Sequence, residues 1–305
     1  MIVARWLLAA SVTVALVLPL QADYREFLEL ARDPSIETKL RMAAEATLKA
    51  YPKLEAGNLA ISVIDMTNPN TIARADHRGE IPFYPASVIK LFFMADVFVT
   101  GNEKVADMER ALKEMIVVSD NDATAYVVDV LARTAPGVSL QGRALQRFIE
   151  SRREINRRFE RLGYTGNVSA MMKPWSFGPY GRELQLLGPD RVNRNKLTAN
   201  ATASLLLWIV RRRAPGSGEM MELMHRPLSP VRDDENQIKE FIGEALPTDA
   251  RLWSKAGWTS EVRMDAAYVE LPNGRKLVLV IFIRGTADDT TLIPAITRNV
   301  LTELE

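Results

Sequence analysis

Two residues, Ser87 and Lys90, have the types and the spacing that nucleophilic acyl transfer requires. Residues three apart share one face of a helix, so the lysine amine can reach the serine hydroxyl and act as its base. Ser87 falls where an extended stretch gives way to a helical pattern. The unpaired N–H groups at a helix start favour developing negative charge. The pair therefore predicts a serine nucleophile that uses lysine in place of histidine.

The Ser-x-x-Lys spacing alone has a second interpretation, a helix N-cap followed by a surface lysine. Its setting favours the chemical one, because Leu91, Phe92 and Phe93 make the following helix largely buried. A lysine at the mouth of a buried helix is desolvated, which favours the neutral amine that can serve as a base.

A second group of polar residues, Ser119-Asp120-Asn121, lies between helices expected over residues 105–117 and 121–133. These residue types also cap helices, so an ordinary helix start is the alternative. In the chemical interpretation, Ser119 relays a proton between Lys90 and a leaving group, and the Asn121 amide holds a substrate carbonyl.

A third group, Lys255-Ala256-Gly257, ends a predicted strand. An edge lysine and a turn glycine are the alternative interpretation. In the chemical one, Gly257 lets a substrate approach the strand closely. The Trp258 and Ser87 N–H groups would form an oxyanion hole, and Lys255 would supply positive charge nearby.

In this order the three groups resemble those of the penicilloyl-serine enzyme superfamily, specifically the class A β-lactamase-like serine hydrolases. The resemblance includes residues 115–130 and 255–285. It implies an α/β domain and an all-α domain with the active site between them. By resemblance, Ser87 is the acylated nucleophile, Lys90 its hydrogen-bonded base and Ser119 the proton relay. Asn121 becomes a substrate contact, and Lys255 becomes the partner of an anionic substrate group.

The same resemblance implies a glutamate that activates the deacylating water from a long loop. The best match is Glu183, which lies in a stretch without clean periodicity, residues 163–195. A solvated loop acid is the alternative interpretation, although a loop this long is usually functional. Arg263 resembles the carboxylate-binding arginine of the family, at a slightly short spacing from Lys255.

Three departures from the family pattern bear on the substrate. The segment between Ser87 and Ser119 is short, which predicts that one wall of the cleft is missing. Ala256 removes a hydroxyl that would bind a substrate carboxylate, a role that Thr259 or Ser260 could fill. Leu187 replaces an asparagine that helps to hold the deacylating water.

The arrangement of elements predicts an α+β fold. Strands are expected over residues 59–66 and 71–75, and again over residues 251–255, 263–271 and 276–284. They would form a five-stranded antiparallel sheet with flanking helices, built from both ends of the chain, with an all-α domain inserted. Residues 23–86 and 214–305 would be the α/β domain. Residues 87–213 would be the helical domain, including an omega-type loop at 163–195. The arginine-rich stretch 145–162 is interpreted as a solvated amphipathic helix.

Composition excludes several kinds of site. The chain has no cysteine and two histidines, so disulfides, a thiol nucleophile and a familiar zinc site are not expected. We expect no metal and no cofactor. Basic residues number 39 and acidic residues 38, a balance that argues against nucleic acid as a partner. The expected partner is a small amide or ester, such as a β-lactam or a peptidoglycan peptide, and the protein is expected to be a monomer.

Residues 1–22 are typical of a secretory signal peptide. Arg5 precedes an apolar run over residues 6–18, Pro19 interrupts it, and Ala22 offers a small residue for cleavage. The run is shorter than the about 20 residues of a membrane-spanning helix. Leu20 is large for its position before the cut, so an uncleaved anchor is the alternative. A secreted or periplasmic location follows.

The sequence thus predicts an exported serine hydrolase that acts through a Ser87 acyl-enzyme, with hydrolysis of β-lactam amides and antibiotic resistance as the implied role. A D-alanyl-D-alanine-type peptidase or an esterase on the same scaffold is one alternative. A penicillin-binding or cell-wall-sensing module that acylates without turnover is another.

Overall fold

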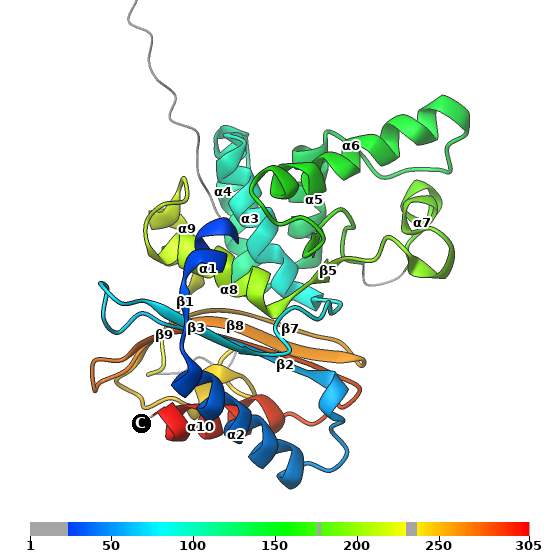
Figure 1. Cartoon of the computed structure of the whole chain (residues 1–305). Helices are drawn as coiled ribbons and strands as arrows, with labels where there is room; N and C mark the ends of the chain where they lie inside the picture. The colour runs from blue at the N-terminus through cyan, green and yellow to red at the C-terminus, as the bar shows by residue number, and fades with distance from the viewer. Residues whose placement is uncertain (1–23, 176–177, 230–236, 305) are drawn as a thin grey trace, which may run out of the picture.

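A mixed sheet lies between two layers of helices in the computed structural model (Figure 1), which describes residues 24–175, 178–229 and 237–304. Within these residues the main sheet has seven strands, in the order β1-β3-β2-β9-β8-β7-β6. The central strands are antiparallel and are β2 (Leu59–Asp65), β3 (Ala73–His77), β7 (Arg251–Trp258), β8 (Val262–Glu270) and β9 (Lys276–Arg284). The predicted signal peptide lies outside the described residues.

The predicted α+β fold, with a sheet built from both ends of the chain, is confirmed, but the strand number was too low. Two short edge strands complete the sheet: β1 (Ala31–Arg32), parallel to β3, and β6 (His225–Arg226), antiparallel to β7. Strands of two residues are too short to show an alternating pattern, so the sequence gives no signal for them. The division into two domains stays a prediction.

Helices cover both faces of the sheet. Figure 1 shows α2 (Pro34–Ala50) and α10 (Leu292–Leu304) on one face and α8 (Ala199–Val210) on the other. The remaining α-helices of the described residues are α1 (Tyr24–Glu29), α3 (Lys90–Val99), α4 (Met108–Lys113), α5 (Asn121–Ala132), α6 (Gly142–Arg161), α7 (Gly181–Leu187) and α9 (Ser217–Met224). No described helix is both long and apolar enough to cross a membrane.

The sheet separates two hydrophobic cores. One joins its inner face to α3, α5 and α8, and the other joins its outer face to α2 and α10. Helix α8 is buried from Ala199 to Ile209 and is mostly apolar, as expected of a central helix, with Asn200, Thr202 and Ser204 as its buried polar residues. This packing fixes α3, and with it Lys90, against the inner face of the sheet.

The long loop predicted over residues 163–195 is more ordered than its sequence suggests. It contains α7 and the short strand β4 (Val168–Ser169), which pairs with β5 (Lys196–Leu197). Leu197 and Phe83 exchange two backbone hydrogen bonds of 2.9 Å. Because Phe83 precedes Ser87 by four residues, this pair ties the end of the loop to the segment that leads into the predicted nucleophile.

Candidate active site

Ser87 lies on a 3₁₀ turn, Ala86–Ile89, that leads directly into α3. The turn begins with a Val88 N–H bond to the Pro85 carbonyl of 3.0 Å. Ala86 has a φ of 43°, a left-handed conformation that is uncommon for a residue other than glycine. Strained backbone of this kind persists at functional sites where the surrounding structure enforces it. The turn places Ser87, half-buried, in the wall of a cavity of about 690 Å³.

Lys90 follows one turn later and is completely buried. Its Nζ donates to the Ser119 carbonyl at 2.6 Å, to Asn121 Oδ1 at 2.9 Å and to Ser119 Oγ at 3.2 Å. Among the described residues, its amine has no hydrogen bond to Ser87, unlike the arrangement that the resemblance implied. Burial lowers the pKa of the Lys90 amine to about 7, although Asp120 opposes the shift. The neutral, basic form is therefore well populated at neutral pH.

Ser119 brings the second and third sequence groups together. It follows a π-helical turn, Glu114–Val118, and takes a left-handed conformation with a φ of 65°. Its Oγ lies 3.2 Å from the Lys90 amine and 2.9 Å from the Lys255 amine. The Asp120 side chain then caps α5 by accepting from the Ala123 N–H at 2.6 Å. The helix-cap interpretation is therefore confirmed for Asp120, whereas the proton-relay role of Ser119 stays a prediction that its contacts with two buried amines allow.

Lys255 is fully buried and does not line the cavity. Its Nζ donates to Ser119 Oγ, to Gln237 Oε1 at 2.5 Å and to the Ala256 carbonyl at 2.7 Å. Burial, with Lys90 and Arg226 nearby, holds the pKa of the Lys255 amine well below its usual range, and Asp265 acts in the opposite direction. The positive charge assigned to Lys255 is thus disfavoured by its surroundings.

Gln237 is a residue of this site that sequence reasoning missed. Its side chain accepts from Lys255 and donates to the carbonyls of Val117 at 2.7 Å and Ile116 at 3.2 Å. It therefore joins strand β7 to the turn that carries Ser119. A glutamine 18 positions before a lysine carries no local signal, because its partners come together only in the fold.

Gly257 and Trp258 place backbone groups beside the Ser87 turn. A Cβ on Gly257 would come within 2.6 Å of the Ser87 nitrogen, so the glycine is required by strand-to-turn packing. The Ala256 N–H donates to Gln237 Oε1 at 3.3 Å, away from β8. Since N–H directions alternate along a strand, the Trp258 N–H also points away from β8. Trp258 lines the cavity, which leaves its N–H as a candidate oxyanion donor.

Glu183 lies in a buried cluster of charged residues on α7 and its neighbours. Its Oε1 accepts from Arg152 Nη2 at 2.5 Å and lies 3.7 Å from the Lys173 amine. Asp129 completes the cluster through ion pairs with Arg152 at 3.5 Å and with Lys173. Glu183 Oε2 is buried and has no hydrogen-bond partner among the described residues. The cavity is lined by Lys173 and Leu184 next to Glu183, but not by Glu183 itself.

The cluster also corrects the interpretation of α6 as a solvated helix. Arg152 is fully buried, and Phe148, Ile155 and Phe159 are buried beside it on the same helix. The position of Arg152 within that apolar stripe is the feature of the sequence that could have predicted its burial. A buried arginine needs partners, and Glu183 and Asp129 supply them.

Arg263 and Ala256 lie away from the cavity. The Arg263 guanidinium donates to Glu240 at 3.1 Å and to the Ala287 carbonyl at 2.9 Å, and it lies over the Phe241 ring. The Ala256 side chain is buried in the outer core. Thr259 does line the cavity, and its hydroxyl oxygen accepts from the Glu261 and Val262 N–H groups.

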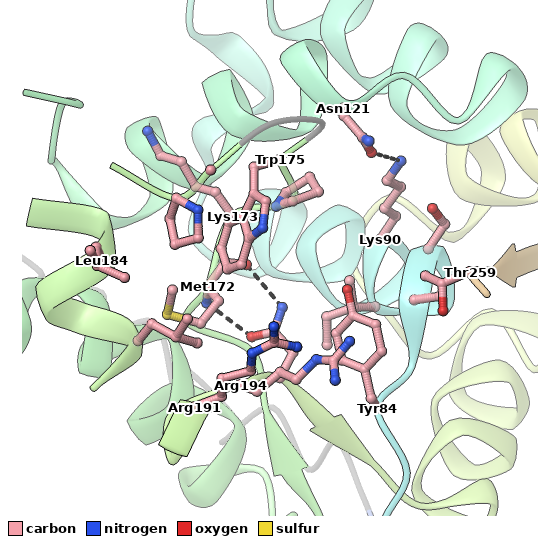
Figure 2. A pocket seen from close by; sticks show the side chains of 18 of the residues that line it. Tyr84, Lys90, Asn121, Met172, Lys173, Trp175, Leu184, Arg191, Arg194 and Thr259 are labelled. Atoms are coloured by element: carbon pink, nitrogen blue, oxygen red, sulfur yellow. Dashed lines mark hydrogen bonds between the residues drawn. The ribbon is translucent and has the colours of Figure 1, made fainter. Parts of the chain in front are cut away.

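Figure 2 shows the cavity from close by, with Lys90 and Asn121 hydrogen-bonded on one side and Arg191, Arg194 and Tyr84 on another. Trp175 and Lys173 belong to the loop that forms the facing wall. The structure thus brings Ser87, Lys90, Asn121 and the Trp258 backbone to one cavity. Ser119 and Lys255 lie directly behind Lys90, while Glu183 and Arg263 are held elsewhere. No described group of acidic or histidine side chains has the arrangement of a metal site.

Three solved structures are similar to this chain over most of its length. A structure of PBP-A has 17% identity and a TM-score of 0.62, covering 90% of this chain and 98% of that one. A PBP-A mutant in an acyl-enzyme complex with penicillin G has 18% identity and a TM-score of 0.62, covering 88% and 96%. A beta-lactamase from Sphaerobacter thermophilus has 19% identity and a TM-score of 0.59, covering 86% and 96%. At these identities the similarity shows the fold.

Family membership comes from the sequence itself. No curated protein matches the chain. The model of the Beta-lactamase enzyme family matches residues 101–304, a span that holds Ser119 and Lys255 and begins after Ser87 and Lys90. The match extends over more than half of the chain, and the serine–lysine turn that precedes it opens into the same cavity. The chain therefore belongs to the Beta-lactamase enzyme family.

Proposed function

We propose that this protein is a serine hydrolase that forms an acyl-enzyme on Ser87 with an amide or ester, a β-lactam being the leading substrate class. One observation carries the proposal: two buried lysine amines converge on the Ser119 hydroxyl behind the cavity wall that holds Ser87. Burial lowers the pKa of both amines, and Lys90, with a pKa of about 7, can accept and return a proton near neutral pH. A surface serine with a solvated lysine would lack this property.

In the proposed acylation, Ser87 Oγ attacks the substrate carbonyl while its proton passes to the neutral Lys90 amine. The Ser87 and Trp258 N–H groups stabilise the negative oxygen of the tetrahedral intermediate. When that intermediate collapses, Ser119 gives its proton to the leaving nitrogen or oxygen. Lys90, protonated by the first step, then restores the Ser119 proton across their 3.2 Å hydrogen bond. Asn121, already bonded to Lys90, contacts the substrate amide.

Deacylation requires an activated water, and Glu183 stays the proposed base for it. Its Oε2 has no partner among the described residues and is the atom left to bind a water. Its other oxygen is committed to Arg152, and Glu183 does not line the cavity. This second observation favours the alternative function, a penicillin-binding or wall-sensing module with slow turnover. A peptidase or esterase of the same mechanism differs only in its substrate.

Intact-mass time courses with benzylpenicillin test the proposal. We expect a transient adduct on the wild type, none on Ser87→Ala and a persistent one on Glu183→Gln. An adduct on Ser87→Ala would refute the nucleophile. A permanent adduct on the wild type would favour the non-turnover module, and no adduct at all would favour an esterase or peptidase that does not accept β-lactams.

Export to the periplasm or the medium, and action there as a monomer on small molecules, belong to the same proposal. The basis for export is the pattern of residues 1–22. Mass spectrometry of the protein recovered from the envelope fraction would show a new amino terminus after Ala22 if the segment is removed.

A further inference from the structure

The strand side of the cavity offers no available cation to a substrate carboxylate. The Lys255 amine is engaged by Ser119, Gln237 and the Ala256 carbonyl, and its burial disfavours the charged form. Arg263 is bonded to Glu240 and the Ala287 carbonyl outside the cavity. Within the described residues, both cations expected on this side are therefore engaged and withdrawn from the pocket.

The loop that follows α7 contributes two arginines to the cavity. Arg191 and Arg194 line the cavity, and Figure 2 shows both on the side of Tyr84. Arg194 lies 3.6 Å from the centre of the Tyr84 ring and pairs with Glu261 at 2.8 Å. Arg191 is exposed and has no ion-pair partner in the described part of the chain. Asp190 is the acidic residue of the described lining and Glu261 offsets Arg194, so Arg191 is the arginine of this loop whose charge is left for a ligand.

The backbone holds Arg191 in an unusual conformation. Asp190 and Arg191 have φ values of 51° and 55°, both left-handed. The turn is fixed by Asn193, whose Nδ2 donates to the Leu186 carbonyl at 2.7 Å, and by an Arg194 N–H bond to the Arg191 carbonyl of 2.9 Å. Two consecutive non-glycine residues in the left-handed region cost free energy. The hydrogen bonds around this turn must therefore enforce its conformation.

We propose that Arg191, flanked by Arg194, binds the carboxylate of the acyl donor that Ser87 attacks. The planar guanidinium group matches a carboxylate with two parallel hydrogen bonds. The substrate class is thus an anionic amide or ester whose carboxylate faces the loop that carries Arg191 and not the buried Lys255 of strand β7. This inference rests on the proposed acylation of Ser87 and deepens it by assigning specificity.

Benzylpenicillin and its methyl ester differ only in the carboxylate charge, so they isolate this contact. We expect Arg191→Gln to lower the acylation efficiency for benzylpenicillin by about ten- to a hundredfold, the usual range for a charged hydrogen bond, and to leave the methyl ester nearly unchanged. Arg191→Lys keeps the charge without the fork and should recover part of the loss. Arg147→Gln, an exposed arginine on α6 outside the cavity, is the matched control.

Two results would overturn the assignment while leaving Ser87 acylation intact. One is equal acylation of the acid and the ester by the wild type. The other is a charge-specific loss in a folded Arg263→Gln variant and none in Arg191→Gln. A neutral fluorophosphonate needs only a nucleophilic serine. Failure of this probe and of both penicillins to label Ser87 would overturn the proposed function, and the carboxylate assignment with it.

Discussion

Two features of the site act in opposite directions on the charged form of the Lys90 amine. Burial disfavours its charged form and lowers its pKa to about 7, whereas oxygen atoms of Ser119 and Asn121 accept its hydrogens. A group with this pKa exchanges between base and acid near neutral pH, which suits the role proposed for Lys90, taking a proton from Ser87 and later returning it. At its usual pKa, the same amine would be almost entirely protonated.

The acylation rate is therefore expected to depend on pH through Lys90. Below about pH 7 the amine is protonated and cannot accept the Ser87 proton, so the rate should rise about tenfold per pH unit and level off above pH 7. Stopped-flow measurement of acylation by a chromogenic β-lactam gives this profile. Asn121→Leu removes an acceptor for the charged form and should move the midpoint to lower pH. A flat profile across this range would exclude Lys90 as the base.

Gln237 joins Lys255 to the carbonyls of Ile116 and Val117, and all of these groups are buried or nearly so. Gln237→Leu keeps a similar volume but leaves them unpaired. We expect a loss of about 1–3 kcal/mol in the free energy of unfolding, measured with urea, together with slower acylation. Gln237→Glu still accepts from Lys255 but cannot donate to the carbonyls, so it should restore only part of the stability. Unchanged stability and rate in Gln237→Leu would show that this contact is dispensable.

At the scale of elements, strand β7 and the Ser87 turn are in direct backbone contact. A Cβ on Gly257 would lie 2.6 Å from the Ser87 nitrogen and 2.8 Å from the Val88 nitrogen, and neither backbone atom can rotate away. Gly257→Ala should therefore displace the turn, with a cost of about 1–3 kcal/mol and a large fall in acylation rate. Gly57→Ala, where the nearest atom is 4.0 Å away, is the control and should be nearly neutral. Wild-type acylation in Gly257→Ala would contradict this packing.

The Arg152 cluster connects α5, α6, α7 and the loop between them. Removing its arginine leaves the Glu183 and Asp129 carboxylates without their buried partner. Arg152→Met is expected to lower the free energy of unfolding by about 3–5 kcal/mol. Arg153, the next residue, pairs with Glu150 at the surface, so Arg153→Met should change it by less than about 1 kcal/mol. Similar values for the two variants in urea denaturation would refute the structural role of the cluster.

The elements differ in how far the sequence could predict them. Ser87 and Lys90 are three residues apart, and Ser119 lies directly before the residue that caps α5, so local spacing was sufficient to single out both groups as candidates. Arg152 lies on a helix that also carries several surface arginines. Only its place within the apolar stripe distinguishes it from them. Gln237 and Arg263 take partners from distant segments, and local pattern carries no information about such pairs.

At the scale of the whole molecule, the two hydrophobic cores place the reacting groups where water is scarce. Lys90 and Lys255 lie at the inner face of the sheet, and Asp265 on β8 is fully buried at the outer face, where it accepts from the Ile242 N–H. Burial raises the pKa of Asp265 to about 7, although backbone N–H groups of Ile242 and Ala266 favour its charged form. The fold therefore holds an acid and a base whose charge states both change near neutral pH.

These two groups give the free energy of unfolding a minimum near neutral pH. Between about pH 4 and pH 7, folded Asp265 keeps a proton that the unfolded chain has lost, so its contribution to stability falls as pH rises. Between about pH 7 and pH 10, the unfolded chain keeps a Lys90 proton that the folded protein has lost, so stability rises with pH. Urea denaturation across this range should show both limbs. Asp265→Asn should reduce the slope of the acid limb, and Lys90→Met should reduce the slope of the alkaline limb, to which the lowered pKa of Lys255 also contributes. If neither substitution changes the slope of its own limb, these buried groups do not set the pH dependence of folding.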